Sequence, residues 1–265
     1  MLDLQAAALR WQAGGRAAVV VEVAATMGSV PREAGTRMLV AADEVLGSIG
    51  GGHLELQAIA DARGLFPATA PFEQRIALGP TLGQCCGGAL TLRFTPLASA
   101  APADWRPAAS RFTLQLYGAG HVGRAVVRLL ADLPCRVQWI DERDGEFPPT
   151  PLPPHIEKIC VEPVAAEVAQ APPGAFFLVL THSHDLDLAL TQAILQRGDF
   201  GWFGLIGSKT KRARFEHRLR ERGFAAEGIS RMVCPIGVPG LTGKQPEVVA
   251  ISVVSQMLFA SSIVV

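Results

Sequence analysis

The sequence predicts an α/β protein in which an N-terminal α+β domain precedes a Rossmann-like domain with a parallel sheet. Strand and helix patterns alternate through the second half of the chain, and a Gly-x-Gly-x-x-Gly motif at 118–123 directly follows a strand pattern. Residues 98–110 are rich in Ala, Pro and Ser, as linkers are. We therefore expect domains at 1–97 and 111–265, joined by a linker at 98–110.

Composition and charge exclude several classes of protein. Of 265 residues, 49% are hydrophobic and 18% charged, which supplies a core and leaves little material for disorder. The 24 basic and 24 acidic residues balance, whereas a nucleic-acid binder would carry a basic excess. No membrane span or secretory signal is evident, and the 5 cysteines lack a disulfide spacing. This pattern is typical of a cytoplasmic protein that binds neither nucleic acid nor membrane.

The elements of the first domain differ in their periodicity. Residues 2–12 form a predicted helix that ends at two glycines, and residues 53–65 form a second one with apolar side chains on one face. Strands are expected where β-branched or alternating apolar residues occur, at 17–25, 37–41, 44–49, 72–78 and 89–97.

The second domain is predicted to alternate strands with helices or loops. A helix at 121–131 follows the glycine motif directly. The expected strands lie at 112–117, 136–140, 158–161, 176–180 and 203–206. This order favours a parallel sheet with helices on both faces.

The motif that opens the second domain has the features of a phosphate-binding loop. Gly118, Gly120 and Gly123 stand between a strand and a helix that His121 begins, and Asp141 closes the next strand about 20 residues later. Such a loop can approach a pyrophosphate at a helix N-terminus, while the acid binds a ribose. Nucleotide binding in this crevice stays an open alternative, because fold and ligand are separable.

Two further glycine-rich loops lie in the first domain. One carries Arg32 and Arg37, which could pair with a phosphate. The other turns from a strand into a helix, so the N–H groups of Gly50 and Gly51 could form an anion nest. The alternative is that these are ordinary turn glycines beside solvated arginines.

Two adjacent cysteines stand in a third glycine-rich loop, Gln84-Cys85-Cys86-Gly87. Neighbouring side chains diverge, so the pair cannot chelate zinc in the manner of Cys-x-x-Cys. The flanking glycines would leave a thiol open to a bulky ligand. The alternative is that both cysteines are buried as small hydrophobic residues.

A His-x-His motif, His182 and His184, follows the fourth strand of the second domain. It departs from the binuclear hydrolase pattern His-x-His-x-Asp-His, because Leu186 and Asp187 replace the Asp and the last His. We therefore expect these histidines to line a ligand crevice at the carboxyl edge of the sheet instead of holding a metal ion.

A basic segment at 209–222 is predicted to be helical. Its cations at helical spacing share one face: Lys211, Arg214, Arg218 and Arg222. This face is either solvated or a docking surface for a phosphate or an acidic partner.

Taken in order, these motifs resemble the xanthine dehydrogenase accessory protein family, XdhC/CoxI. The N-terminal part of the resemblance lies in the loops at 28–38, 47–55 and 83–88. The C-terminal part lies at 118–123, 181–184, 204–209, 235–237 and 246–250. The combination of Gln-Cys-Cys-Gly-Gly with Gly-Ala-Gly-His-Val-Gly is more specific than either motif alone, and the match covers nearly the whole chain.

The resemblance implies a maturation factor and not a metabolic enzyme. Such a protein would bind the molybdenum cofactor, a molybdenum pyranopterin, support its sulfuration by a cysteine desulfurase, and insert it into apo-xanthine dehydrogenase. Cys85 is then the expected molybdenum or sulfido contact, and the protein is expected to be a homodimer. The cofactor-binding candidates are Arg32, Arg37, Gly50, Gly51, Gln84, Cys85, Cys86, Gly87, Gly118, Gly120, His121, Gly123, Asp141, His182 and His184.

Two alternatives belong to other functional classes. One is an NAD(P)-dependent oxidoreductase, with Asp141 on the ribose and His121 or His182 as the catalytic residue. The other is a purely structural assembly chaperone that grips the apo-enzyme and never touches the cofactor.

Overall fold

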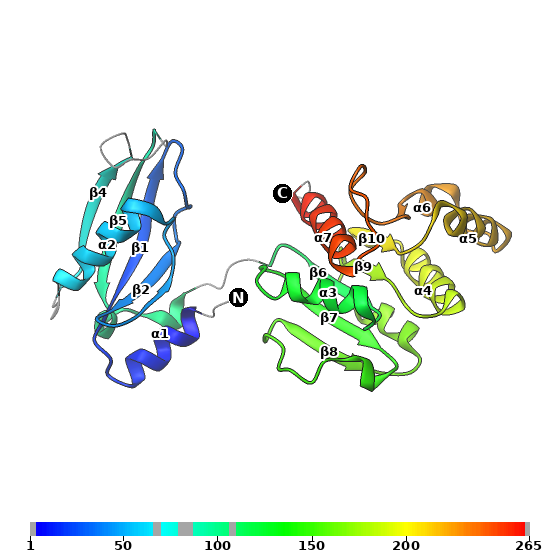
Figure 1. Cartoon of the computed structure of the whole chain (residues 1–265), viewed down its shortest axis with the longest axis horizontal. Helices are drawn as coiled ribbons and strands as arrows, with labels where there is room; N and C mark the ends of the chain where they lie inside the picture. Colours follow the sequence, from blue (N-terminus) through cyan, green and yellow to red (C-terminus); the bar gives the residue numbers. More distant parts are fainter. Residues whose placement is uncertain (1–3, 66–69, 79–86, 106–109, 263–265) are drawn as a thin grey trace. The chain divides into compact units, whose positions relative to one another are not determined.

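The computed structural model describes residues 4–65, 70–78, 87–105 and 110–262. The chain divides into two compact units, residues 2–107 and 108–265, each of which is described by itself (Figure 1). The first is α+β and the second is a parallel-sheet Rossmann-like unit, so the predicted fold class is confirmed. No helix in the described part of the chain is long and apolar enough to cross a bilayer.

The first unit contains an antiparallel sheet with the strand order β3-β2-β1-β5-β4. Its strands are β1 (Ala18–Met27), β2 (Arg37–Ala41), β3 (Val45–Gly47), β4 (Phe72–Ala77) and β5 (Ala89–Pro96). All five strands coincide with predicted ones to within a few residues, because each alternates or concentrates apolar side chains.

Helices cover both faces of this sheet. The helix α2 (Gly52–Gly64) buries Leu54, Ala58 and Ala62 in one core cluster with strand side chains such as Phe94. The helix α1 (Leu4–Ala13) contributes Ala7 and Ala8 to a second cluster, which also contains Val20 and Leu39. An apolar cluster therefore lies on each face of the sheet, although the strands also carry ion-paired side chains such as Glu22, Arg37 and Arg93.

Part of the predicted linker is folded onto this unit. Two 3-10 turns, Leu97–Ser99 and Pro102–Asp104, follow β5 and lie against α1. Gln12 Nε2 donates to the carbonyl oxygens of Leu97 and Ala100 at 2.8 and 2.9 Å, and Gln5 Nε2 donates to that of Pro102 at 2.9 Å. A linker-like composition could not reveal these carbonyl contacts, which hold residues 97–102 against α1, and the boundary between the two units falls within the predicted linker, at 107/108.

The second unit contains a parallel sheet with the order β11-β10-β9-β6-β7-β8. Its strands are β6 (Thr113–Tyr117), β7 (Arg136–Asp141), β8 (Ile156–Cys160), β9 (Phe176–Val179), β10 (Trp202–Leu205) and β11 (Met232–Val233). Counted from β6, this is the 3-2-1-4-5-6 order of a Rossmann fold, with the switch point between β6 and β9.

Helices lie on both faces of this sheet, as predicted (Figure 1). One face is covered by α3 (His121–Leu130) and α7 (Pro246–Ser262), which pack in one cluster with Trp139 and Leu178. The other is covered by α4 (His184–Arg197), α5 (Lys209–Glu221), α6 (Ala226–Ser230) and the 3-10 segment Val164–Gln170. A further 3-10 turn, Asp144–Glu146, follows β7.

Candidate functional site

The glycine-rich loop of the second unit joins β6 to α3 and packs tightly at two of its three glycines. Gly118 has a φ of 120°, and a side chain there would collide with the carbonyl of Leu180. A side chain at Gly123 would collide with the carbonyl oxygen of Gly118, so α3 lies close against the strand end. Open space lies beside Gly120, where a ligand could approach the backbone.

The predicted ribose-binding acid, Asp141, is engaged within the chain. Its carboxylate accepts a hydrogen bond from the Ala119 N–H at 2.7 Å and three from Arg143, each at 2.9 Å. Burial opposes ionisation, but the hydrogen bonds from Arg143 and Ala119 outweigh it and hold the pKa of Asp141 below its ordinary value. A ribose would have to compete with these partners for the carboxylate.

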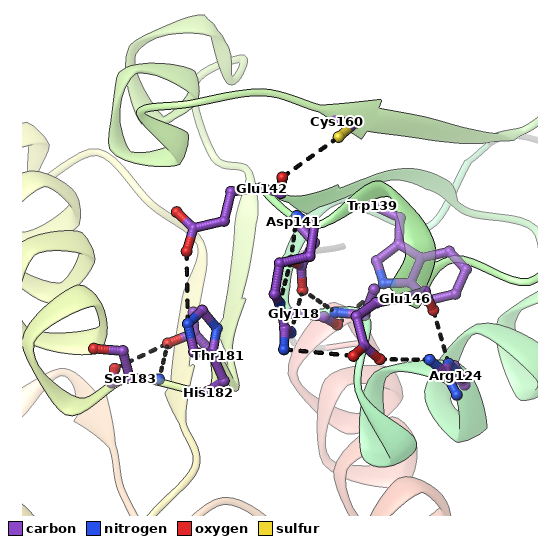
Figure 2. Close-up of polar contacts among 12 residues, drawn as sticks. Gly118, Arg124, Trp139, Asp141, Glu142, Glu146, Cys160, Thr181, His182 and Ser183 are labelled. Atoms are coloured by element: carbon purple, nitrogen blue, oxygen red, sulfur yellow. Dashed lines mark hydrogen bonds and ion pairs between the residues drawn. The ribbon is translucent and has the colours of Figure 1, made fainter.

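His182 faces Glu142 across the same crevice (Figure 2). The distance from His182 Nε2 to Glu142 Oε1 is 3.6 Å, which joins the loop after β9 to the residue that follows β7. The space left beside Gly118 and Asp141 is about 10 Å³, enough for about one water molecule. In this conformation, the glycine-rich crevice has no room for a ribose at this point.

A larger cavity opens one strand further along, between the loops that follow β9 and β10. Its volume is about 350 Å³, and it is lined by both loops and by the first turns of α4 and α5. His182, His184, Lys211 and Arg214 all line it. The sequence placed the two histidines and the basic face in separate motifs, and the fold brings them together.

The glycine-rich loops of the first unit also meet. A side chain at Gly50 would lie 2.7 Å from the ring of Pro31, so the loop before α2 packs on the loop after β1. A side chain at Gly88 would collide with the carbonyl oxygens of Met27 and Ser29. The start of β5 therefore lies against the same loop, and the described parts of all three loops gather at one end of this unit.

The predicted anion nest at Gly50 and Gly51 holds a carboxylate of this chain. Glu55 Oε2 accepts hydrogen bonds from Ser48 Oγ at 2.5 Å, Ile49 N–H at 2.9 Å and Gly51 N–H at 3.1 Å. Burial raises the pKa of Glu55, but the hydrogen bonds from Ser48, Gly51 and Ile49 outweigh that effect and lower it overall. An external anion could enter the nest only by displacing Glu55.

The two candidate arginines of the first unit differ in their surroundings. Arg37 donates to Glu22 Oε1 at 2.7 Å, and its guanidinium lies 5.1 Å from the centre of the Trp105 ring. Arg32 is exposed on the loop that contacts Gly50 and forms no ion pair within the described part of the chain. Of the two arginines, Arg32 is the one open to a ligand.

The cysteines divide into three groups. Gln84, Cys85 and Cys86 lie outside the described residues, whereas Gly87, which follows them, is exposed. Cys135 and Cys234 are buried. Cys160 is exposed at the end of β8, and its Sγ lies 3.7 Å from the carbonyl oxygen of Glu142 (Figure 2).

Metal ligation was not expected at the His-x-His motif. Among the described residues, no group of three or more His, Cys, Asp or Glu side chains lies close enough together to hold a metal ion. Cys85, the predicted molybdenum contact, falls outside those residues.

Sequence reasoning missed two polar contacts that define these loops. The carboxylate of Glu55 stands in the first turn of α2, where helix dipoles favour an acid, and this was the available signal. The second is a buried ion pair between Lys211 and Asp187, which joins α5 to α4. These residues lie 24 positions apart, and no local pattern connects them.

Family models of known proteins match both units of the chain. A family model described as the XdhC Rossmann domain matches residues 114–257, and one described as the XdhC and CoxI family matches residues 11–76. The uncharacterized protein YqeB of Escherichia coli (strain K12) is 31% identical over 246 residues, which are 90% of this chain and 42% of YqeB. The chain thus spans less than half the length of that curated relative.

A crystal structure described as a xanthine dehydrogenase from Bacillus halodurans has a similar fold. The TM-score is 0.71 at 18% sequence identity, and the match covers 97% of this chain and 95% of that chain. At this level of identity the likeness concerns the fold alone.

Proposed function

This chain belongs to the XdhC and CoxI family, and from that premise we propose that it is an accessory protein of a xanthine dehydrogenase-type molybdoenzyme. In this proposal its cargo is the molybdenum cofactor, which it binds, shields during sulfuration by a cysteine desulfurase, and passes to the apo-enzyme. We propose that it acts as a homodimer.

The observation that carries the proposal is the meeting of the three glycine-rich loops of the first unit. Gly88, two residues after Cys86, lies against the backbone of Met27 and Ser29, on the loop that also carries Arg32. A thiolate is a soft ligand suited to molybdenum and to sulfur chemistry, and an exposed guanidinium suits the phosphate of the pterin. These residue types fit the cargo.

The residues proposed to hold the cargo are few. Arg32 would bind the pterin phosphate, and a thiol of the Cys85–Cys86 pair would contact molybdenum or its sulfido ligand. Glu55 already accepts a hydrogen bond in the backbone nest at Gly51. The nest would therefore order the loop, and Arg32 would bind the phosphate. The glycines would keep side chains out of the approach path.

A dinucleotide-dependent oxidoreductase is the second candidate, and the Rossmann strand order is what favours it. Two observations count against it. The carboxylate of Asp141 is taken up by Ala119 and Arg143, and about 10 Å³ of space is left beside it. This candidate therefore has less support than the accessory role.

The test is to purify the full chain from a host that makes the molybdenum cofactor. We expect molybdenum and oxidised pterin to elute with the protein in gel filtration, with no turnover of NAD(P)H in the same fractions. Protein that elutes free of both would contradict cofactor handling and favour a purely structural chaperone. Nicotinamide turnover would favour the oxidoreductase.

A further inference from the structure

The cavity between the β9–α4 and β10–α5 loops lies in the second unit and has no role in the proposed cargo site. Its volume, about 350 Å³, lies within the roughly 300–1,000 Å³ of small-molecule sites. It opens at the carboxyl ends of β9 and β10, one strand away from the switch point between β6 and β9 at which ligands of open α/β sheets usually bind. It is also far larger than the space beside Gly118 and Asp141.

The acid that lines this cavity is already neutralised. Asp187 is buried, and one of its carboxylate oxygens accepts from the N–H and hydroxyl of Thr181 at 3.1 and 2.7 Å. The other oxygen pairs with Lys211 Nζ, which also donates to the carbonyl of Ile206 at 2.8 Å. Asp187 therefore offers no free negative charge to the cavity.

The loop after β10 leaves room for the side chain of Lys211. A side chain at Gly207 would lie 2.6 Å from Lys211 Cδ, so the glycine lets the lysine stem cross the backbone and reach Asp187. Ser208 caps α5 by accepting from the Lys211 N–H at 3.2 Å. The cavity wall is thus fixed by contacts within the chain before any ligand arrives.

The remaining charge at the cavity is positive. Arg214 is exposed, and its side chain forms no ion pair or hydrogen bond within the described part of the chain. The exposed rings of His182 and His184 and the hydroxyl of Thr210 stand on the same lining. One unpaired guanidinium, two imidazoles and a hydroxyl are suitable partners for a phosphate.

We propose that this cavity binds the phosphate of a phosphate monoester, with Arg214 as the main contact and His184 and Thr210 beside it. The phosphate site of the Rossmann-like unit then lies at β9 and β10 and not at the glycine motif that the sequence singled out. The phosphate could belong to a nucleotide or to a sugar or pterin phosphate. The inference does not depend on whether the first unit binds the molybdenum cofactor.

The test is calorimetric titration of the full chain at low salt with AMP, ribose 5-phosphate and adenosine. We expect both phosphates to bind and adenosine to fail. The variant Arg214→Gln should weaken AMP binding about tenfold or more, as expected for one charge-assisted contact. Equal affinities for the two phosphates would support a sugar or pterin phosphate as the source, and tighter binding of AMP would support a nucleotide.

Two control variants test whether the phosphate binds at this cavity. Arg222→Gln removes the same charge at the end of the same helix but away from this cavity, and it should leave AMP binding unchanged. Gly120→Val fills the open space at the glycine motif, where φ is −68°, and should also leave binding unchanged. A loss of binding in Gly120→Val but not in Arg214→Gln would overturn the proposal.

Histidine ring signals in NMR spectra report the position directly. On addition of AMP, we expect the His184 signals to shift while those of His121, at the glycine motif, stay in place. Shifts confined to His121, or no binding of either phosphate up to about 5 mM, would contradict a phosphate site at this cavity.

Discussion

At the scale of single residues, two carboxylates accept hydrogen bonds from backbone N–H groups. Both lie at glycine-rich loops for which the sequence predicted the binding of an external anion. Glu55 accepts from Ile49 and Gly51, and Asp141 accepts from Ala119. Each carboxylate satisfies donors that would otherwise need water or a ligand. The consequence is that glycine-rich loops of this chain are ordered internally, and ligand anions are expected to bind at the free arginines Arg32 and Arg214.

The pH dependence of stability tests the role of Glu55. Because its folded-state pKa lies below the ordinary 4.5, its ionised form stabilises the fold above that pH, and the contribution is lost as pH falls through the folded-state pKa. Glu55→Gln should therefore lower the free energy of unfolding by about 1–2 kcal/mol at pH 7. The difference from wild type should shrink below about pH 4.5 in urea titrations.

The control for this measurement is Glu33→Gln. Glu33 is exposed, and its side chain forms no hydrogen bond or ion pair within the described residues, so its substitution should change stability by less than about 0.5 kcal/mol. If the deficit of Glu55→Gln stays constant from about pH 3 to 7, the carboxylate does not order the loop as inferred.

Thiol reactivity tests the burial of the cysteines in the second unit. Burial raises the pKa of Cys135 to about 11 and also raises that of Cys234, whereas Cys160 is exposed. Since the thiolate is the nucleophile, iodoacetamide at about pH 8 should alkylate Cys160 at least about tenfold faster than Cys135 in the native protein. Peptide mass spectrometry follows each site; equal rates before unfolding would refute this description.

The candidate residues show where prediction from sequence ends. The glycines could be assigned, because close approach at Gly118, Gly123 and Gly88 leaves no room for any other residue. The hydrogen-bond partner of each polar side chain could not be predicted from the sequence. Asp141 stands where a ribose-binding acid belongs, yet its carboxylate is held by Ala119 and Arg143, contacts that only the three-dimensional arrangement reveals.

At the scale of elements, the ion pair between Lys211 and Asp187 joins α5 to α4. The side chains are 11% and 1% exposed, so removal of one partner leaves a charge in a poorly hydrated place. Lys211→Met should lower the free energy of unfolding by about 3–5 kcal/mol. Lys209→Met, an exposed lysine on the same helix, should have little effect; equal losses in urea unfolding would mean that the pair contributes nothing specific.

The basic face of α5 has fewer free cations than the sequence suggested, because Lys211 is paired with Asp187. Arg218 lies 3.8 Å from the exposed carboxylate of Asp185, and Arg222 forms no ion pair among the described residues. If this face docks an acidic partner, Arg218→Glu with Arg222→Glu should weaken binding to the desulfurase or the apo-enzyme, most strongly at low salt. An unchanged affinity at low salt in calorimetry would show that this face is solvated and docks no acidic partner.

Element prediction succeeded where periodicity was strong. The strand β1 follows from a β-branched run, and the helix α3 follows from a glycine motif that opens a helix. The two-residue strand β11 and the short helix α6 were missed, because segments of this length carry no measurable period. Parallel pairing, not local propensity, creates β11.

At the scale of the whole molecule, the two units have separate hydrophobic cores. The clusters around Phe94 and Leu39 draw only on the first unit, and those around Trp139 and Phe203 draw only on the second. Each unit can therefore keep its own site: loops with an exposed arginine in the first, and a cationic cavity in the second. In our proposals, the first unit holds the cargo and the second binds a phosphate.

We propose that a thiol of the Cys85–Cys86 pair holds the molybdenum cofactor, and cofactor retention by serine variants measures this contact. Serine keeps the size of cysteine but removes the soft donor. Cys85→Ser with Cys86→Ser should fold normally, lose molybdenum and pterin in gel filtration, and fail to activate apo-xanthine dehydrogenase. Cys85→Ser alone should be more severe than Cys86→Ser, while Cys160→Ser, an exposed thiol of the other unit, should retain the cofactor. Retention of the cofactor by the double variant at wild-type affinity would contradict a thiol contact.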